Sequence, residues 1–400
     1  MQAFRLLHDL QKDTDLKRNR RIAGVAAIAA LALTLTACGN DAVPSDDSTN
    51  GSDETTETEE DAPEGDADAE LSGTIAGAGA SAQENGQVAW AAEFSTANPG
   101  LNISYDSVGS GNGRTAFIDG GVLYAGSDSS MKPEEIEAAT ARCFGESPIE
   151  VPLWISPIAV VYNIPDLNDT NINMTPETIA NVFAGEITNW NDPAIADDNP
   201  DLDLPDLQIV PVNRSDNSGT TNNFTAYLVD AAGDAWPHEA DEAWPITGTQ
   251  SGAQTSGLLE VVNGAEGTIG YVDASRVGEL GSVAVGVGDD FVPFSSEAAA
   301  KIVDISEPAE SATDLIQAID LARDTQEAGV YPVVLVSYLI TCSAFDNEQD
   351  ATNVQSFFSY IASEEGQNLA AQPDVGGTAP ISADLRDRVQ AALDQIHVAN

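Results

Sequence analysis

The sequence predicts an α/β protein with a mostly parallel sheet, and two observations support this class. From Leu71 onward, short apolar runs rich in β-branched residues alternate with stretches whose apolar residues recur every three or four positions. Strands and helices that alternate in this way favour parallel strands joined by helices. The chain has 400 residues, of which 42% are hydrophobic, and this is enough for a sizeable core in one or two domains.

The pattern places the elements in a regular order along the chain. It begins with a strand at 73–76, a helix through Trp90 and Phe94, and a strand at 101–105, which together form a β-α-β unit. Further strands are predicted at 158–162, 209–212, 267–272 and 331–340. Further helices are predicted at 176–184, 222–228, 351–362 and 382–396.

Residues 1–37 have the features of a secretory signal. Four basic residues within 17–21 precede an apolar run of 16 residues at 22–37, which is shorter than the roughly 20 residues that cross a bilayer. The run ends in Leu-Thr-Ala-Cys-Gly and resembles the bacterial lipobox, whose cysteine receives a lipid. We therefore expect a lipid anchor on Cys38 at the extracytoplasmic face of the cell membrane. The alternative is an ordinary signal peptide followed by an incidental cysteine.

The charge of the chain is strongly one-sided. Its 15 basic and 65 acidic residues give a formal charge of −50, which repels nucleic acids and anionic membrane surfaces and excludes a nucleic-acid-binding role. Residues 38–70 contain 13 acidic residues and no basic or aromatic one, so we expect a disordered acidic tether there. A binding role for this tract is the alternative. Only three histidines occur, far apart, and we expect no metal, no cofactor and no enzymatic activity.

Cys143 and Cys342 are the only cysteines that follow Cys38. Because an exported protein meets an oxidising environment, we expect these two residues to form a disulfide. The bond would close a loop of about 200 residues, for which the chain-entropy relation gives on the order of 5 kcal/mol. Two buried free thiols are the alternative.

Three segments have a composition typical of anion sites, in which a strand ends in glycine and hydroxyl residues and a helix begins at once. They are Gly-Ala-Gly-Ala-Ser-Ala at 77–82, Ser-Val-Gly-Ser-Gly-Asn-Gly at 107–113 and Ser-Asp-Asn-Ser-Gly-Thr-Thr at 215–221. A helix start offers unpaired N–H groups and the positive end of the helix dipole, and glycine lets a ligand approach the backbone. Ordinary helix caps and tight turns are the alternative. The first segment is also a partial dinucleotide fingerprint, but none of the three is followed by a Walker lysine.

Six sequence blocks, taken in order, resemble the phosphate-binding protein of bacterial phosphate ABC importers over most of residues 72–400. They lie at 77–81, 98–111, 126–128, 190–195, 213–221 and 267–272, and Arg-Ser-Asp-x-Ser-Gly-Thr at 214–220 is the most specific piece. The resemblance implies the two-lobed α/β fold of type II periplasmic binding proteins, with the ligand in the cleft between the lobes. The implied limits are 71–157 and 331–400 for lobe I and 158–330 for lobe II.

The resemblance also implies the residues that bind phosphate. The implied donors to the phosphate oxygens are Ser81, the N–H of Ala82, Ser110, Arg214, Ser218, Gly219 and Thr220. Asp128 would accept a proton carried by phosphate, and Asp216 would hold Arg214, the sole cation, in place. The alternatives are a surface ion pair for Arg214 and Asp216, and a helix cap for Asp128. The sequence departs from the family pattern at Ala82, at Leu123-Tyr124 and at Asn217, and none of these changes removes an implied donor.

The implied function is an extracytoplasmic receptor, a monomer, that captures inorganic phosphate and delivers it to the permease subunits of an ABC importer. A receptor for another tetrahedral oxyanion, such as sulfate or molybdate, is the nearest alternative. An ionised Asp128 argues against it, because that carboxylate would repel a fully ionised sulfate. A secreted phosphatase is a third possibility, but the scattered carboxylates and few histidines offer no clear nucleophile with its base and no two-metal cluster.

Overall fold

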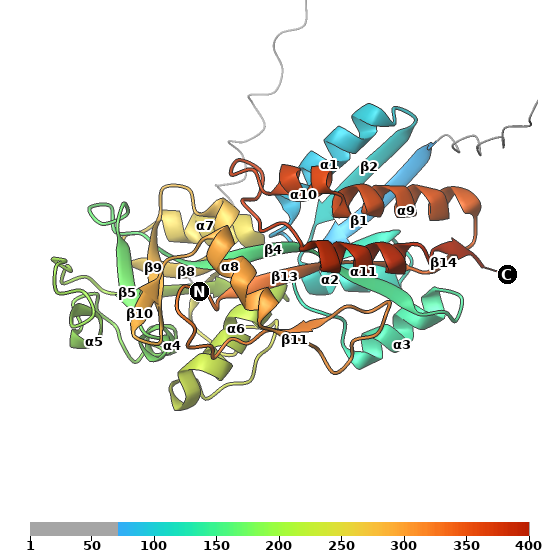
Figure 1. The fold of residues 1–400 in the computed structure, drawn as a ribbon. Coiled ribbons are helices and arrows are strands. Elements are labelled where there is room, and N and C mark those ends of the chain that lie inside the picture. The colour runs from blue at the N-terminus through green and yellow to red at the C-terminus, as the bar shows by residue number, and fades with distance from the viewer. Residues whose placement is uncertain (1–70, 400) are drawn as a thin grey trace, which may run out of the picture. The chain divides into compact units, whose positions relative to one another are not determined.

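A mixed sheet of eleven strands organises residues 71–399, the part of the chain that the computed structural model describes (Figure 1). All of these residues fall within one unit that spans Asp66–Asn400. The predicted signal at 1–37, Cys38 and the predicted tether at 38–70 lie outside the described residues. Within 71–399, no helix combines the length and the apolar character that a membrane crossing requires.

The main path of the sheet runs β2-β1-β3-β13-β4-β8-β6-β7. The first half of the sheet consists of β1 (Gly73–Gly79), β2 (Leu101–Ser107), β3 (Tyr124–Ser127), β13 (Val334–Cys342) and the start of β4 (Pro148–Tyr162). The second half consists of the end of β4 with β8 (Thr268–Asp273), β6 (Val210–Arg214), β7 (Gln250–Gly252), β9 (Gly281–Val287), β5 (Asn171–Met174) and β10 (Asp290–Val292). Strand β4 pairs with β13 through Pro157 and with β8 from Ile158, so it belongs to both halves. The lobe limits expected from the sequence stay a prediction.

Two short pairs of strands lie outside this sheet. They are β11 (Glu307–Pro308) with β12 (Ile319–Asp320), and β14 (Ala344–Phe345) with β15 (His397–Val398).

Helices accompany both halves of the sheet (Figure 1). Those that follow or precede strands of the first half are α1 (Glu84–Ala97), α2 (Ser110–Ile118), α3 (Pro133–Arg142), α9 (Glu348–Ala362), α10 (Glu364–Ala370) and α11 (Ala383–Leu393). Those in the chain of the second half are α4 (Pro176–Ala184), α5 (Pro193–Ala196), α6 (Gly219–Ala232), α7 (Gln254–Asn263) and α8 (Ser296–Asp304), with short 3-10 turns at Gly233–Ala235 and Ala274–Arg276.

The α/β class is confirmed, but the prediction of a mostly parallel sheet is wrong. Strand β1 runs parallel to β2 and β3, and β6 runs parallel to β7 and β8. The long central strands β13 and β4 are antiparallel to each other, and β4 is antiparallel to β8. Every residue of β4 and β13 is buried. A strand buried on both faces reads as a continuous apolar run in either direction, so the hydrophobic pattern did not reveal its orientation.

The predicted disulfide is present and joins Cys143, which follows α3, to Cys342 at the end of β13. Both cysteines are fully buried. The bond connects segments that are 199 residues apart in the sequence. It therefore ties the return segment of the chain to the first part of the first half.

We expect loss of this disulfide to lower the free energy of unfolding by up to about 5 kcal/mol, because the unfolded chain regains the entropy of a long loop. The comparison is Cys143→Ser with Cys342→Ser against the unmutated protein, by urea unfolding followed through tryptophan fluorescence. A lower urea midpoint is the expected result. An unchanged midpoint with an unchanged slope would contradict the stabilising role.

Candidate anion-binding site

The carboxyl ends of β1, β2 and β3 meet and bring three loops together. The carbonyl of Gly79 accepts the N–H groups of Val108 and Gly109 at 3.0 and 2.8 Å. The N–H of Ala80 donates to the carbonyl of Gly126 at 2.9 Å. A Cβ added at Gly79 would lie only 2.0 Å from that carbonyl oxygen. Glycine is therefore required at this close approach of two chain segments.

The N-termini of α2 and α6, which come from different halves of the sheet, face each other. Helix α2 begins at Ser110, directly after Gly109, whose φ is +90°. Helix α6 begins at Gly219, and the Ser218 side chain caps it by accepting the N–H of Thr221. A Cβ on Gly219 would lie 2.6 Å from the Ser110 Oγ, so the two helix starts are in near contact. Two positive helix ends that converge in this way favour an anion between or beside them.

Arg214 ends β6 and is 3% exposed. Its Nε and Nη2 donate to the two carboxylate oxygens of Asp216 at 2.8 and 2.6 Å. Burial alone would raise the pKa of Asp216, but the bonds and charge of Arg214 outweigh it and hold that pKa below its ordinary value. Within residues 71–399, the Nη1 of Arg214 has no hydrogen-bond partner. The guanidinium is therefore fixed by Asp216 and keeps donor capacity for a further acceptor.

Asp128 directly follows β3 and is 2% exposed. Its Oδ1 accepts the hydroxyl of Ser337 at 2.6 Å, and its Oδ2 accepts the hydroxyl of Thr220 at 3.1 Å. Its backbone N–H donates to Ser110 Oγ at 3.1 Å. Burial raises the pKa of the carboxyl to about 6, against the opposing effect of the hydroxyl bonds. The helix-cap alternative is wrong, because α3 begins at Pro133 with Lys132 as its cap residue.

The structure places Ser81 differently from the other predicted site residues. Its Oγ lies 2.9 Å from the Oγ1 of Thr255 and accepts the N–H of Thr255 at 3.1 Å. Thr255 lies at the start of α7, in the second half. The neighbouring Ala82 is buried, and α1 begins only at Glu84 rather than directly after the loop. The Asp128 carboxylate accepts from Thr220, and the Asp128 N–H donates to Ser110. Ser81 instead contacts the second half through Thr255, away from these residues.

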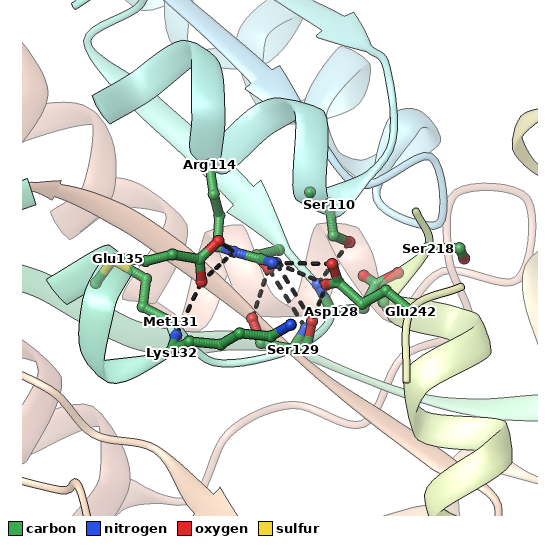
Figure 2. Close-up of polar contacts among 12 residues, drawn as sticks. Ser110, Arg114, Asp128, Ser129, Met131, Lys132, Glu135, Ser218 and Glu242 are labelled. Atoms are coloured by element: carbon green, nitrogen blue, oxygen red, sulfur yellow. Dashed lines mark hydrogen bonds and ion pairs between the residues drawn. The ribbon is translucent and has the colours of Figure 1, made fainter. Parts of the chain in front are cut away.

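Several residues that contact this site were not predicted. The hydroxyl of Tyr271 accepts the backbone N–H of Arg214 at 3.2 Å and lies 2.8 Å from the Oγ1 of Thr221. Arg114 and Glu242 form a buried ion pair beside the site (Figure 2). The sequence did contain a signal for Arg114. It lies four residues after Ser110 in a segment where a helix was predicted to begin, so both side chains lie on the same face of that helix. Nothing in the sequence pointed to Glu242 or Ser337.

No group of three or more His, Cys, Asp or Glu side chains within 71–399 is arranged to hold a metal ion. The chemistry of the site is that of backbone N–H groups, hydroxyls, one fixed guanidinium and one buried carboxyl. These groups can bind a tetrahedral oxyanion through many short hydrogen bonds, and a carboxyl that also accepts a proton can select among such anions.

The fold and the site together define the class of extracytoplasmic solute-binding proteins. The PBP superfamily domain matches residues 64–365 of the chain. Phosphate-binding protein PstS3 of Mycobacterium bovis is 31% identical over 390 residues, which cover 95% of this chain and all of that protein. The chain belongs to the PstS family of phosphate-binding proteins, the substrate-binding proteins of ABC transporters.

Solved structures share the fold at lower identity. A high-affinity periplasmic phosphate-binding protein solved with bound phosphate has a TM-score of 0.64 at 20% identity, and covers 80% of this chain and 93% of its own. A phosphate ABC transporter substrate-binding protein from Clostridium perfringens, also solved with phosphate, has a TM-score of 0.55 at 21% identity. It covers 78% of this chain and all of its own.

Proposed function

We propose that this protein captures inorganic phosphate outside the cytoplasm and delivers it to the permease subunits of an ABC importer, while a lipid on Cys38 holds it at the membrane. Family membership supports the ligand class and the transport role. The observation that carries the proposal for this chain is the junction of the α2 and α6 N-termini beside Arg214, whose guanidinium is fixed and retains donor capacity.

In this proposal the two halves of the sheet are the two lobes, with limits at 157/158 and 330/331, and phosphate lies between them. The donors to its oxygens are Ser81, the N–H of Ala82, Ser110, Arg214, Ser218, Gly219 and Thr220. Asp128 accepts the proton that phosphate carries near neutral pH. Each carboxylate oxygen of Asp128 accepts one hydroxyl and so has a further lone pair for this proton.

The acidic surface does not prevent capture of an anion. Without residues 1–37 the chain has nine basic and 62 acidic residues, a formal charge of −53. Salt at about 0.1 M screens exposed charges beyond roughly 10 Å. Donors that touch a buried ligand act at short range in a medium of low dielectric constant. The global charge therefore slows association more than it weakens the bound complex.

Calorimetric titration of the purified protein with phosphate, sulfate and molybdate tests the proposal. We expect one phosphate per chain and an affinity for phosphate more than tenfold above that for sulfate. A chromogenic phosphate ester should not be hydrolysed. Absence of phosphate binding, or equal affinity for phosphate and sulfate, would overturn the proposed ligand.

A further inference from the structure

We propose that Arg114, Glu242 and Ser129 form a clasp that holds the two halves of the protein together without touching the ligand. Glu242 lies in the second half, between Gly233–Ala235 and β7, whereas Arg114 lies on α2 and Ser129 follows β3 in the first half. The proposal rests on the proposed function, because it assigns these residues to closure over bound phosphate.

The contact between Arg114 and Glu242 is bidentate and buried. Arg114 Nη1 donates to Glu242 Oε1 at 2.9 Å, and Nη2 donates to Oε2 at 3.0 Å. The Ser129 hydroxyl adds a bond to Oε1 at 2.6 Å. The side chains of Arg114 and Glu242 are 2% and 7% exposed. Figure 2 shows Arg114 between Glu242 on one side and Glu135 on the other.

A second ion pair between the halves is much more exposed. Arg276 and Glu84 are 3.3 Å apart, and their side chains are 22% and 43% exposed. An exposed pair with this geometry contributes little, because water competes for both charges. Of these two ion pairs, Arg114–Glu242 is therefore the stronger electrostatic contact between the halves.

The clasp is built into the same segments as the candidate site. Arg114 lies one helical turn after Ser110 on α2, and Ser129 follows Asp128. The carbonyl of Glu242 accepts the N–H of Ser218, which caps α6, at 3.1 Å. A change in the clasp is thus transmitted directly to the two helix starts and to Asp128.

Arg114 has an acidic partner in its own half, whereas within residues 71–399 the Glu242 carboxylate has no hydrogen-bond partner in its own half. Glu135, on α3, accepts from Arg114 Nε at 3.0 Å and compensates the guanidinium when the halves part. Among the described residues, every hydrogen bond to the Glu242 carboxylate comes from Arg114 or Ser129 of the first half. Burial alone would raise the pKa of Glu242, but Arg114 and Ser129 reverse this and hold the pKa below its ordinary value. The ionised carboxylate therefore favours the closed arrangement.

The net charge of both halves is negative and opposes their approach. Residues 158–330 contain 30 acidic and four basic residues, and residues 71–157 with 331–400 contain 19 acidic and five basic ones. Two bodies of the same sign repel when they approach. A buried pair of opposite charges across their boundary offsets part of that repulsion.

Glu242→Gln tests the clasp, with Asp241→Asn as the matched control. Asp241 is the adjacent residue, is exposed, and bonds only to the nearby Ala243 N–H through its side chain within the described residues. Both variants remove one negative charge from the same loop. We expect Glu242→Gln to raise the Kd for phosphate about tenfold, mainly through faster release, and Asp241→Asn to leave it near that of the unmutated protein.

Amide hydrogen exchange measured on the full chain supplies a readout of closure that affinity alone does not. Without phosphate, residues 108–115 and 215–222 should exchange faster in Glu242→Gln than in Asp241→Asn, and saturating phosphate should remove the difference. If both variants match the unmutated protein in Kd and exchange, the clasp does not exist.

If Glu242→Gln fails to fold, Ser129→Ala provides a second test. This variant should raise the Kd about threefold, and an unchanged Kd would overturn the proposal. If the unmutated protein binds no phosphate, the proposed function fails, and the exchange comparison still tests the clasp.

Discussion

Arg214→Ala is expected to weaken phosphate, sulfate and molybdate binding together, by about a hundredfold or more. The substitution removes the cation fixed at the end of β6 and leaves Asp216 as an uncompensated carboxylate next to the anion. Loss of one partner of a buried, hydrogen-bonded charge pair costs about 2 to 5 kcal/mol. Phosphate, sulfate and molybdate all present unprotonated oxygens that can accept from this cation, so the loss of affinity is expected for each of them.

The measurement is calorimetric titration of Arg214→Ala with all three anions. Arg388→Ala is the control, because Arg388 is an exposed residue of α11 and its loss changes the net charge equally. The control should bind phosphate like the unmutated protein. If Arg214→Ala retains its phosphate affinity, or if both variants lose it equally, Arg214 is not part of the site.

Asp128→Asn is expected to narrow the preference for phosphate over sulfate by more than tenfold while phosphate binding stays measurable. Near neutral pH phosphate carries at least one proton and sulfate carries none, so only phosphate donates a hydrogen bond to an ionised Asp128. A hydrogen bond to a charged group contributes about 1.5 to 3 kcal/mol. The asparagine amide can donate as well as accept and no longer repels sulfate.

The same substitution should stabilise the ligand-free protein at alkaline pH. Burial raises the pKa of Asp128 to about 6. The folded state therefore binds a proton on the Asp128 carboxyl more tightly than the unfolded state does. The contribution of Asp128 protonation to the free energy of unfolding is fully present below the ordinary carboxyl pKa. It is lost as the pH rises to about 6. Asn does not titrate, so its advantage should reach at most about 3 kcal/mol at pH 8 and disappear near pH 4.

Thermal unfolding of ligand-free Asp128→Asn at pH 4 and pH 8, beside anion titrations, measures both effects. Asp106→Asn, on the exposed side of β2, is the control for the loss of one charge. An unchanged phosphate-to-sulfate ratio in Asp128→Asn would show that Asp128 does not choose the anion. An equal shift of melting temperature at both pH values would contradict the assigned cause of its raised pKa.

Much of the fold and part of the site could be predicted because the signals are local. The glycine and hydroxyl residues of 107–113 and 215–221 lie directly at the starts of α2 and α6. Arg214 and Asp216 are two residues apart, so their contact follows from a single turn. The helix at 176–184 was predicted at its observed limits from apolar residues that recur every three or four positions, and in the structure Pro176 begins it and Gly185 caps its end.

The rest depends on contacts between distant segments. Ser337 lies 209 residues from Asp128, and Glu242 lies 128 residues from Arg114. No local pattern marks such pairs, because either residue alone reads as an ordinary polar residue of a loop or strand. The direction of β4 and β13 was hidden for a related reason, since both are buried along their whole length.

The position of the bound anion tests the central claim most directly. Arsenate has the shape and protonation of phosphate, and arsenic scatters X-rays anomalously, so a crystal grown with arsenate locates the anion without ambiguity. We predict one arsenic peak between the N-termini of α2 and α6, with arsenate oxygens within hydrogen-bond distance of Arg214, Ser110 and Asp128. An arsenic peak elsewhere on the protein, in a crystal of protein that binds phosphate in solution, would contradict this account.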